Sequence, residues 1–167
     1  MKVIMIALMV AMAPVVTAAE ESWTGFYAGA QLGFSDLSDD TTSTADSTLG
    51  AHAGYLHDFG GYVLGGELSY DAGAEFVSGG SIEKVDTVRA KIKGGRVFGR
   101  TMLYGVAGFA NMDTAAGNVD GYSVGIGASY RASEKIVVGA EYLHDTFDTT
   151  GGNTKADTIS LRLSYAF

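Results

Sequence analysis

The sequence predicts an all-β fold, an eight-stranded antiparallel up-and-down transmembrane β-barrel. Its main support is a series of short segments in which apolar and polar residues alternate. Alternation with a period of two places successive side chains on opposite faces of a strand, and a tilted strand of about 9–11 residues crosses a bilayer. Glycine is also frequent, with 24 residues in 167 and a single proline. That is about twice the ordinary usage of glycine and shows no collagen period, so the glycines must lie in strands and turns.

The first 19 residues have the pattern of a secretory signal peptide. Lys2 supplies a positive charge, residues 3–16 are mainly apolar, and Thr17, Ala18 and Ala19 are small residues suited to cleavage. We expect cleavage after Ala19, with Ala18 as the alternative, and assign residues 20–167 to the barrel domain. No later run of about 18 apolar residues occurs, so any membrane span must be built from strands.

Eight alternating segments follow in the rest of the chain. They are residues 24–34, 49–57, 62–70, 85–93, 101–111, 121–130, 136–144 and 157–167. The apolar residues expected on one face are Phe26, Ala28, Ala30, Leu32 and Phe34; Leu49, Ala51, Ala53 and Tyr55; Tyr62, Leu64, Leu68 and Tyr70; Val88, Ala90 and Ile92; Met102, Tyr104, Val106 and Ala110; Tyr122, Val124, Ile126, Ala128 and Tyr130; Ile136, Val138, Ala140 and Tyr142; and Ile159, Leu161, Leu163, Tyr165 and Phe167.

The connections between these segments alternate in length. Short turns are expected at 58–61, 94–100 and 132–135, and longer polar loops at 35–48, 71–84, 112–120 and 145–156. Short turns at one end and long loops at the other are typical of outer-membrane barrels. With an even number of strands, both termini lie at the periplasmic end.

The residues opposite the apolar face decide which face is inside. Long charged side chains alternate there with glycine and serine, and six of them are expected to form a network in the lumen: Glu67, Arg89, Lys91, Lys93, Glu141 and Arg162. A cation facing lipid at the bilayer midplane costs about 2–4 kcal/mol, so a one-residue slip of 85–93 would be strongly unfavourable. The apolar face therefore points to lipid.

The aromatic residues at the strand ends are expected to form the two interfacial girdles. Tyr55, Tyr62, Tyr104, Tyr130, Tyr165 and Phe167 are assigned to the periplasmic side, and Phe34, Tyr70, Tyr122 and Phe147 to the outer side. The remaining acidic residues fall mostly in the outer loops.

Several short motifs resemble one known family. They are Trp23-Thr24-Gly25-Phe26-Tyr27-Ala28-Gly29, Val63-Leu64-Gly65-Gly66-Glu67, Thr87-Val88-Arg89-Ala90-Lys91, Tyr104-Gly105-Val106-Ala107-Gly108 and Gly139-Ala140-Glu141-Tyr142. From about residue 22 to the end, the chain resembles the small eight-stranded outer-membrane β-barrels that include opacity-type surface proteins and the transmembrane domain of outer membrane protein A.

The resemblance implies a location in the bacterial outer membrane. The final strand, with Leu163, Tyr165 and Phe167, is similar to the signal that the outer-membrane assembly machinery recognises. Outer-membrane lipids and lipopolysaccharide are further expected partners, the barrel is expected to be a monomer, and its loops could meet a host or cell-surface ligand.

The charged lumen allows two functional interpretations. Eight-stranded barrels have interiors filled by side chains, which favours an internal salt-bridge network. We expect Glu67 to pair with Arg89 and Lys91, and Glu141 to pair with Arg162, because buried charges need partners. A narrow porin-like channel is the alternative, and the main hypothesis is a structural role in the envelope together with surface interactions.

Other kinds of site have weaker support. His144 beside Asp145 could serve a lipid A-modifying enzyme with a loop serine, but no histidine and serine stand two apart on a late strand, as they do in lipid A deacylases. We therefore expect His144 to be a rim residue and the protein not to be an enzyme. Asp36, Asp39, Asp40 and Asp46 match no EF-hand spacing, so a solvated loop is favoured over a weak Ca²⁺ or Mg²⁺ bridge to lipopolysaccharide phosphates.

Composition narrows the remaining classes. The chain has 11 basic and 19 acidic residues, which argues against a nucleic-acid partner, and no cysteine, which excludes disulfides and thiolate metal sites. No cofactor and no metal site are expected.

Overall fold

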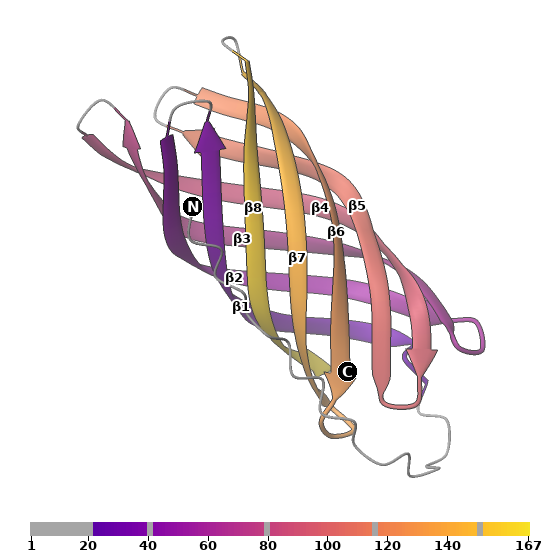
Figure 1. Cartoon of the computed structure of the whole chain (residues 1–167). Helices are drawn as coiled ribbons and strands as arrows, with labels where there is room; N and C mark the ends of the chain where they lie inside the picture. Colours follow the sequence, from indigo (N-terminus) through magenta and orange to yellow (C-terminus); the bar gives the residue numbers. More distant parts are fainter. Residues whose placement is uncertain (1–21, 40–41, 79–80, 115–116, 150–151) are drawn as a thin grey trace.

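The chain folds into one closed barrel (Figure 1). The computed structural model describes residues 22–39, 42–78, 81–114, 117–149 and 152–167, with side chains described outside 36–46, 73–85, 114–117 and 148–154. The strands are β1 (Gly25–Asp39), β2 (Thr42–Asp58), β3 (Tyr62–Ser78), β4 (Ser81–Phe98), β5 (Thr101–Thr114), β6 (Gly117–Arg131), β7 (Ile136–Thr149) and β8 (Gly152–Ala166). Each strand is antiparallel to its neighbours, and β1 pairs with β8 to close the sheet. The predicted eight-stranded antiparallel barrel is confirmed.

The three turns at one end of the barrel, which we call the turn end, are short. They follow β2, β4 and β6, and the carboxyl terminus lies at the same end (Figure 1). Gly60 and Gly61 have positive φ angles of 87° and 95°, which suit glycine. Both donate backbone N–H groups to Asp58 Oδ1 at 2.9 Å. Although burial alone would raise it, backbone hydrogen bonds from Gly61, Trp23 and Gly60 lower the pKa of the Asp58 carboxyl.

At the opposite end of the barrel, which we call the hairpin end, the prediction of long loops is wrong. β1 ends at Asp39 and β2 begins at Thr42, and their ladder is paired without interruption from Gly25↔Leu56 to Asp39↔Thr42. The other three hairpins also extend through most of the expected loop residues. The alternation of apolar residues stops before the strands do, because strand beyond the bilayer is wet on both faces and needs no apolar side.

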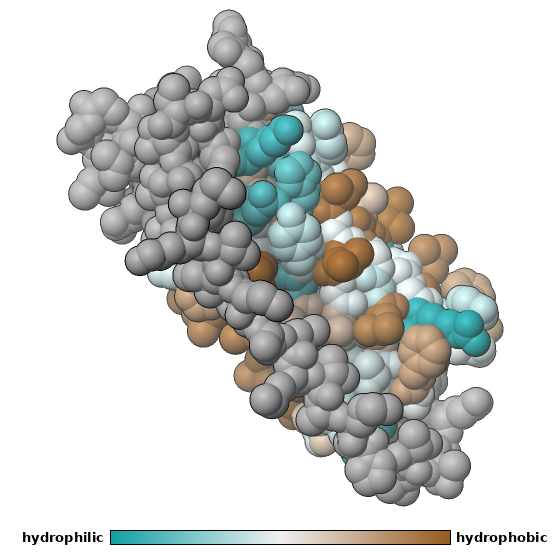
Figure 2. Space-filling view, viewed as in Figure 1, coloured by the Kyte–Doolittle hydropathy of each residue, from teal (hydrophilic) through white to brown (hydrophobic). Residues whose placement is uncertain are grey.

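The apolar face points outward on seven of the eight strands, as predicted. Phe26, Leu68 and Ile126, for example, are 67%, 63% and 68% exposed. Figure 2 shows apolar side chains across much of the visible outer wall, with hydrophilic ones towards its ends. An exposed belt of this kind needs lipid around it. In the described part of the chain there is no helix that could span a membrane.

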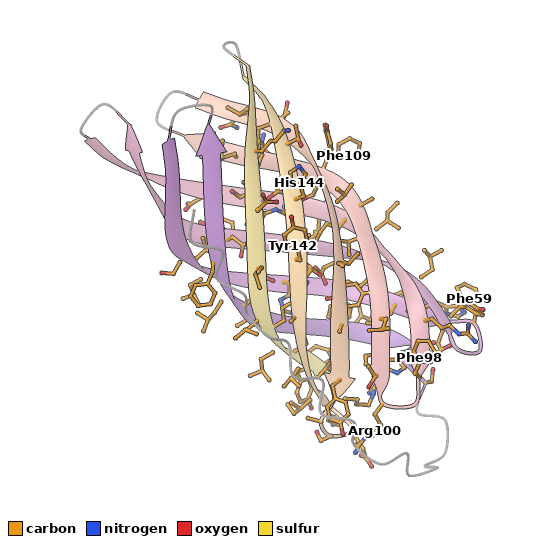
Figure 3. All side chains as sticks on the ribbon, in the orientation of Figure 1. Phe59, Phe98, Arg100, Phe109, Tyr142 and His144 are labelled. Atoms are coloured by element: carbon orange, nitrogen blue, oxygen red, sulfur yellow. The ribbon has the colours of Figure 1, made fainter. Side chains whose placement is uncertain are left out.

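The prediction for β5 is wrong. Met102, Tyr104, Val106 and Ala110 are buried inside, whereas Leu103 and Phe109 are exposed on the outer wall, where Figure 3 labels Phe109. Both faces of β5 are apolar, so periodicity could not choose between them. The pairing with β4 decides which face of β5 points inward. Paired residues point to the same side of a sheet, and Val106 lies opposite Lys93, which faces the lumen.

Two of the aromatic residues predicted for the interfacial girdles lie inside the barrel instead. Tyr104 is 5% exposed and Phe147 is 1% exposed. Phe147 shares the inward face of β7 with Glu141 and Asp145, and it packs with Ala110, Met112 and Ala156 towards the hairpin end. A second apolar cluster begins at the turn end with Trp23, Leu56, Val63 and Met102 and extends to Val106 and Leu143 beside the charged residues. Apolar clusters thus flank the charged middle of the lumen.

Candidate functional site: the charged lumen

All six residues predicted for the lumen are buried. Their exposed fractions run from 2% at Glu141 to 6% at Arg162. Each lies on a strand segment whose alternate residues face lipid, so the period of the strand alone turns these side chains inward. A charge in this position needs compensating partners close by.

Most of these residues form one cluster, which we call the Glu67–Glu141 network. Glu67 is in contact with Lys93 at 2.6 Å, Arg162 at 2.7 Å and Lys91 at 2.9 Å. Glu141 is paired with Lys91 at 2.6 Å and with Arg162. The expected pairs of Glu67 with Lys91 and of Glu141 with Arg162 are therefore present.

Two tyrosines complete the Glu67–Glu141 network. Tyr27 donates its hydroxyl to Glu67 at 2.7 Å, and Tyr104 donates to Glu141 at 3.0 Å. The Lys93 ammonium also lies 4.3 Å from the centre of the Tyr104 ring. Gly127 makes room for this ring, since a Cβ there would lie 2.4 Å from the Tyr104 hydroxyl. The interior glycines thus accommodate tyrosine as well as the long cations.

The expected pairing of Arg89 with Glu67 is wrong. Arg89 contacts Asp71 at 2.5 Å through Nη1 and Asp145 at 2.6 Å through Nη2, and its Nε donates to Asp145 Oδ2 at 3.1 Å. Ser123 also donates to Asp145. These groups form a second cluster nearer the hairpin end, the Asp71–Asp145 network. Arg89 lies two residues from Lys91, the residue that pairs directly with Glu67, and is therefore nearer the hairpin end than Glu67 is. Its planar guanidinium can bind two carboxylates at once.

Asp71 and Asp145 were assigned to the outer loops by sequence reasoning, and that assignment is wrong. They are 6% and 0% exposed. Both stand four residues after an interior glutamate, Glu67 and Glu141, so the period of two would have placed them inside had the strands been extended far enough.

With Asp71 and Asp145 included, the charges of the two networks balance. Glu67, Asp71, Glu141 and Asp145 oppose Arg89, Lys91, Lys93 and Arg162, in place of the expected excess of two cations. Within this total the Glu67–Glu141 network has one more cation than carboxylates, and the Asp71–Asp145 network has one fewer.

His52 was also missed, and it joins three strands. Its Nδ1 lies 3.1 Å from Gln31 Oε1, and its Nε2 lies 2.7 Å from Ser164 Oγ. Gln31 Nε2 donates to Asp71 at 2.6 Å, which turns the amide oxygen towards the imidazole. Nδ1 therefore carries the proton, and Nε2 accepts the hydrogen bond from the Ser164 hydroxyl.

This contact crosses the seam that closes the barrel. His52 lies on β2 and Ser164 on β8, and between them Gly29 of β1 pairs with both residues. A Cβ at position 29 would lie 2.7 Å from His52 Nε2. Only glycine leaves room for the imidazole to reach from β2 to β8.

The remaining candidate residues lie apart from the lumen. His144 is half-buried, and its Nδ1 is 2.7 Å from Asp157 Oδ1, which also accepts the Tyr142 hydroxyl at 2.6 Å (Figure 3). Leu163, Tyr165 and Phe167 are exposed on the outward face at the end of the chain.

The acidic candidates near the hairpin end are not tested. Asp40 lies outside the described residues, and the side chains of Asp36, Asp39 and Asp46 are also outside the described set. Among the residues that are described, no group of three or more metal-ligating side chains could hold an ion.

The closed sheet, the lipid-facing apolar wall and the buried charges together define a small outer-membrane β-barrel. Comparison by sequence agrees: the family described as outer membrane protein beta-barrel domain matches residues 5–167. The chain belongs to this family, and it is an outer-membrane protein. No curated protein sequence matches it.

Solved structures share the fold. Neisserial surface protein A superposes with a TM-score of 0.66 at 16% identity, over 86% of this chain and 98% of that one. Ail, the attachment invasion locus protein of Yersinia pestis, gives 0.57 at 18% identity, over 86% and 99%. Ail was also solved with the heparin analogue sucrose octasulfate, and that structure gives 0.57 at 15% identity, over 86% and 99%.

Proposed function

We propose that the protein is a non-enzymatic, non-conducting outer-membrane barrel that supports the envelope and presents an acidic surface outside the cell. The observation that carries this proposal is the lumen. Four carboxylates and four cations neutralise one another across it, and apolar clusters lie on both sides of them. An ion crossing the barrel would have to break pairs whose side chains are almost entirely buried, and breaking one buried pair costs about 3–5 kcal/mol.

Planar-bilayer recording of the purified protein tests the closed lumen. We expect no reproducible unitary conductance, and the same result for Arg100→Gln, an exposed residue of the β4–β5 turn. The narrow porin-like channel is the alternative. A reproducible open state that Glu67→Gln or Arg89→Gln abolishes would establish the channel and refute our proposal.

The outer surface is the second part of the proposal. Eleven acidic residues stand against Lys84 and Lys155 in the extended hairpins 35–48, 72–86, 112–120 and 146–157. Such a charge favours basic partners and repels polyanions. The chain should therefore differ from Ail, which was crystallised with a sulfated heparin analogue. Cells displaying the protein should bind immobilised polylysine in a salt-sensitive way and should not bind heparin; preference for heparin would contradict this interpretation.

The absence of enzymatic activity is also proposed. The hydrogen bond from Ser164 to His52 has the geometry that activates a serine nucleophile. Both residues are buried, however, and we assign their contact to holding β2 and β8 together across β1. A fluorophosphonate probe should therefore leave the folded protein unlabelled. Labelling that Ser164→Ala removes would reveal an acyl-transfer site.

Processing and assembly complete the proposal. Residues 1–19 are removed on export, and Leu163, Tyr165 and Phe167 direct the chain to the assembly machinery. The exposure of these three side chains on the outer face at the end of β8 and just beyond it supports that role. The mass of the protein recovered from outer membranes tests the cleavage, and loss of membrane assembly in Phe167→Ser tests the signal.

A further inference from the structure

The outer wall of the barrel contains a groove of about 710 Å³ that crosses the strands from β1 to β5, with Phe167 at the β1 end. Its floor consists of small residues: Ala28, Ala53, Gly66 and Ala90. Larger side chains stand beside this floor, among them Phe26 at one end and Phe109 at the other (Figure 3). Glu67 and Lys91 also border the groove, but their side chains are 0% exposed, so on this face they contribute backbone.

The groove follows one row of paired residues on the lipid-facing side. Tyr165 pairs with Ala28, Ala28 with Ala53, Ala53 with Leu68, Leu68 with Ala90, and Ala90 with Phe109. Tyr165 is the next-to-last residue of β8, whereas Phe109 lies eight residues after Thr101, where β5 begins. Because the strands of a barrel are staggered, the row therefore goes deeper into the membrane with each strand.

The depth of the groove matches one leaflet of the membrane. Eight residues of strand are about 27 Å long, and a tilt of about 35–45° reduces this to a depth of about 20 Å. A bilayer is about 40–45 Å thick with its headgroup regions, so each leaflet is about 20 Å thick. The groove starts at the turn end, which is the periplasmic end of an outer-membrane barrel. It therefore has the direction and length of a lipid chain in the periplasmic leaflet.

A cation lies where the groove meets the periplasmic surface. Lys135 Nζ is 5.6 Å from the centre of the Tyr165 ring, at the shallow end of the row. The Tyr165 ring is 5.1 Å from that of Phe167, which lines the groove. Lys135 is exposed, and it forms no ion pair with the residues that the structure describes. Its ammonium is therefore free to bind a phosphate at the level of the headgroups.

The outward-facing charges distinguish the two leaflets. Towards the hairpin end, the carboxylates of Asp86 and Asp157 face outward and accept hydrogen bonds from neighbouring tyrosines. Towards the turn end, Arg96 and Lys135 lie over outward-facing aromatic rings. Carboxylates repel the phosphates of lipopolysaccharide, whereas cations attract those of phospholipids. The charges thus favour a lipid of the periplasmic leaflet as the occupant of the groove.

We propose that the groove holds one phospholipid of the periplasmic leaflet. Lys135 binds its phosphate, and one acyl chain lies along the row from Tyr165 to Phe109. The chain makes contacts on its floor and on both sides there, more than a lipid makes on a convex part of the wall, and these dispersion contacts add up. This lipid should therefore remain bound when the other lipids around the barrel are exchanged for detergent.

Native mass spectrometry tests the proposal, because it counts the lipids bound to each protein molecule. Protein purified from outer membranes in detergent is titrated with palmitoyl-oleoyl phosphatidylglycerol. We expect one lipid to bind saturably before any other. Ala53→Phe places a ring on the floor of the groove and should weaken this binding about tenfold. Ala128→Phe is the matched control: it lies on the lipid-facing side of β6, paired with Leu103 and outside the groove, and should leave binding unchanged.

A second pair of variants tests the headgroup contact. Lys135→Gln should weaken binding about threefold, as expected for an exposed ion pair. Arg100→Gln removes an exposed cation from the same end of the barrel but outside the groove, and should have no effect. Unchanged binding in Ala53→Phe or Lys135→Gln, or equal weakening by Ala53→Phe and Ala128→Phe, would overturn the proposal. So would a dimer that Ala53→Phe abolishes, which would assign the groove to a second copy, or stronger binding of lipid A, which would assign it to the outer leaflet.

Discussion

Replacing Glu67 by glutamine should be among the most destabilising changes in this barrel. Four groups converge on its carboxylate: Lys93 Nζ at 2.6 Å, Arg162 Nη2 at 2.7 Å, the Tyr27 hydroxyl at 2.7 Å and Lys91 Nζ at 2.9 Å. Glutamine retains the size of the side chain but removes its charge and turns a donor towards cations. Three cations would then share Glu141 alone.

The magnitude follows from burial. The Glu67 side chain is 0% exposed, so water cannot replace the lost charge. Breaking a buried ion pair by removing one partner costs about 3–5 kcal/mol, which is a large part of a typical stability of about 5–15 kcal/mol. We therefore expect Glu67→Gln to lose at least about 3 kcal/mol of unfolding free energy.

Reversible urea unfolding in lipid vesicles, followed by Trp23 fluorescence, measures this loss. Glu134→Gln, in an exposed turn, is the matched control and should change stability by less than about 0.5 kcal/mol. Adding Lys93→Gln to Glu67→Gln removes one of the uncompensated cations, so the double variant should lose less than the sum of the single variants. A loss below about 1 kcal/mol for Glu67→Gln, or strict additivity in the double variant, would refute the proposed dependence on charge balance.

Three further predictions follow from the geometry. Gly29→Ala should lower the free energy of unfolding by about 1–3 kcal/mol, because its Cβ would lie 2.1 Å from the Leu163 carbonyl oxygen and 2.7 Å from His52 Nε2. Gly66→Ala is the control, because the nearest neighbour of its Cβ would be 3.9 Å away. Equal urea midpoints for the two variants would contradict the seam contact. Because the pKa of Asp58 is lowered in the folded protein, its ionised carboxylate stabilises the fold at pH values above the ordinary carboxyl pKa, and this stabilisation is lost as the pH falls through the folded pKa. Asp58→Asn should therefore make the stability of the protein depend less on pH in the acid range. An unchanged acid range in urea unfolding would show that this carboxyl is not the cause. Because the chain has no cysteine, nitroxide labels on single introduced cysteines can test which face of β5 meets lipid. Labels at Leu103→Cys and Phe109→Cys should collide with oxygen dissolved in the lipid, and a label at Met102→Cys should not. The reverse pattern would show that the assigned orientation of β5 is wrong.

The sequence alone determined the class of fold and the inward face of most strands. Within residues 62–70, 88–93, 136–142 and 159–165 of β3, β4, β7 and β8, the inward face carries charge and the outward face carries none, so only one orientation avoids exposing ions to lipid. Residues 101–112 of β5 have no charge on either face, and the orientation of this strand required its pairing with β4. The extent of the strands was hidden for a related reason: beyond the bilayer no apolar side is needed, and a polar strand there has the composition of a loop.

The partners of the interior charges were decided by the tertiary structure. Sequence identifies which side chains point inward but not their height in the barrel, because the stagger between strands is set by the closure of the sheet. That stagger brings Arg89 to Asp71 and Asp145, and it aligns His52 with Ser164 across Gly29. The period of two is a local property of the chain, whereas register in a closed barrel depends on all eight strands together. For this reason most of the membrane-facing wall and two of the ion pairs could be predicted from the sequence, while the other ion pairs and the seam contact required the folded structure.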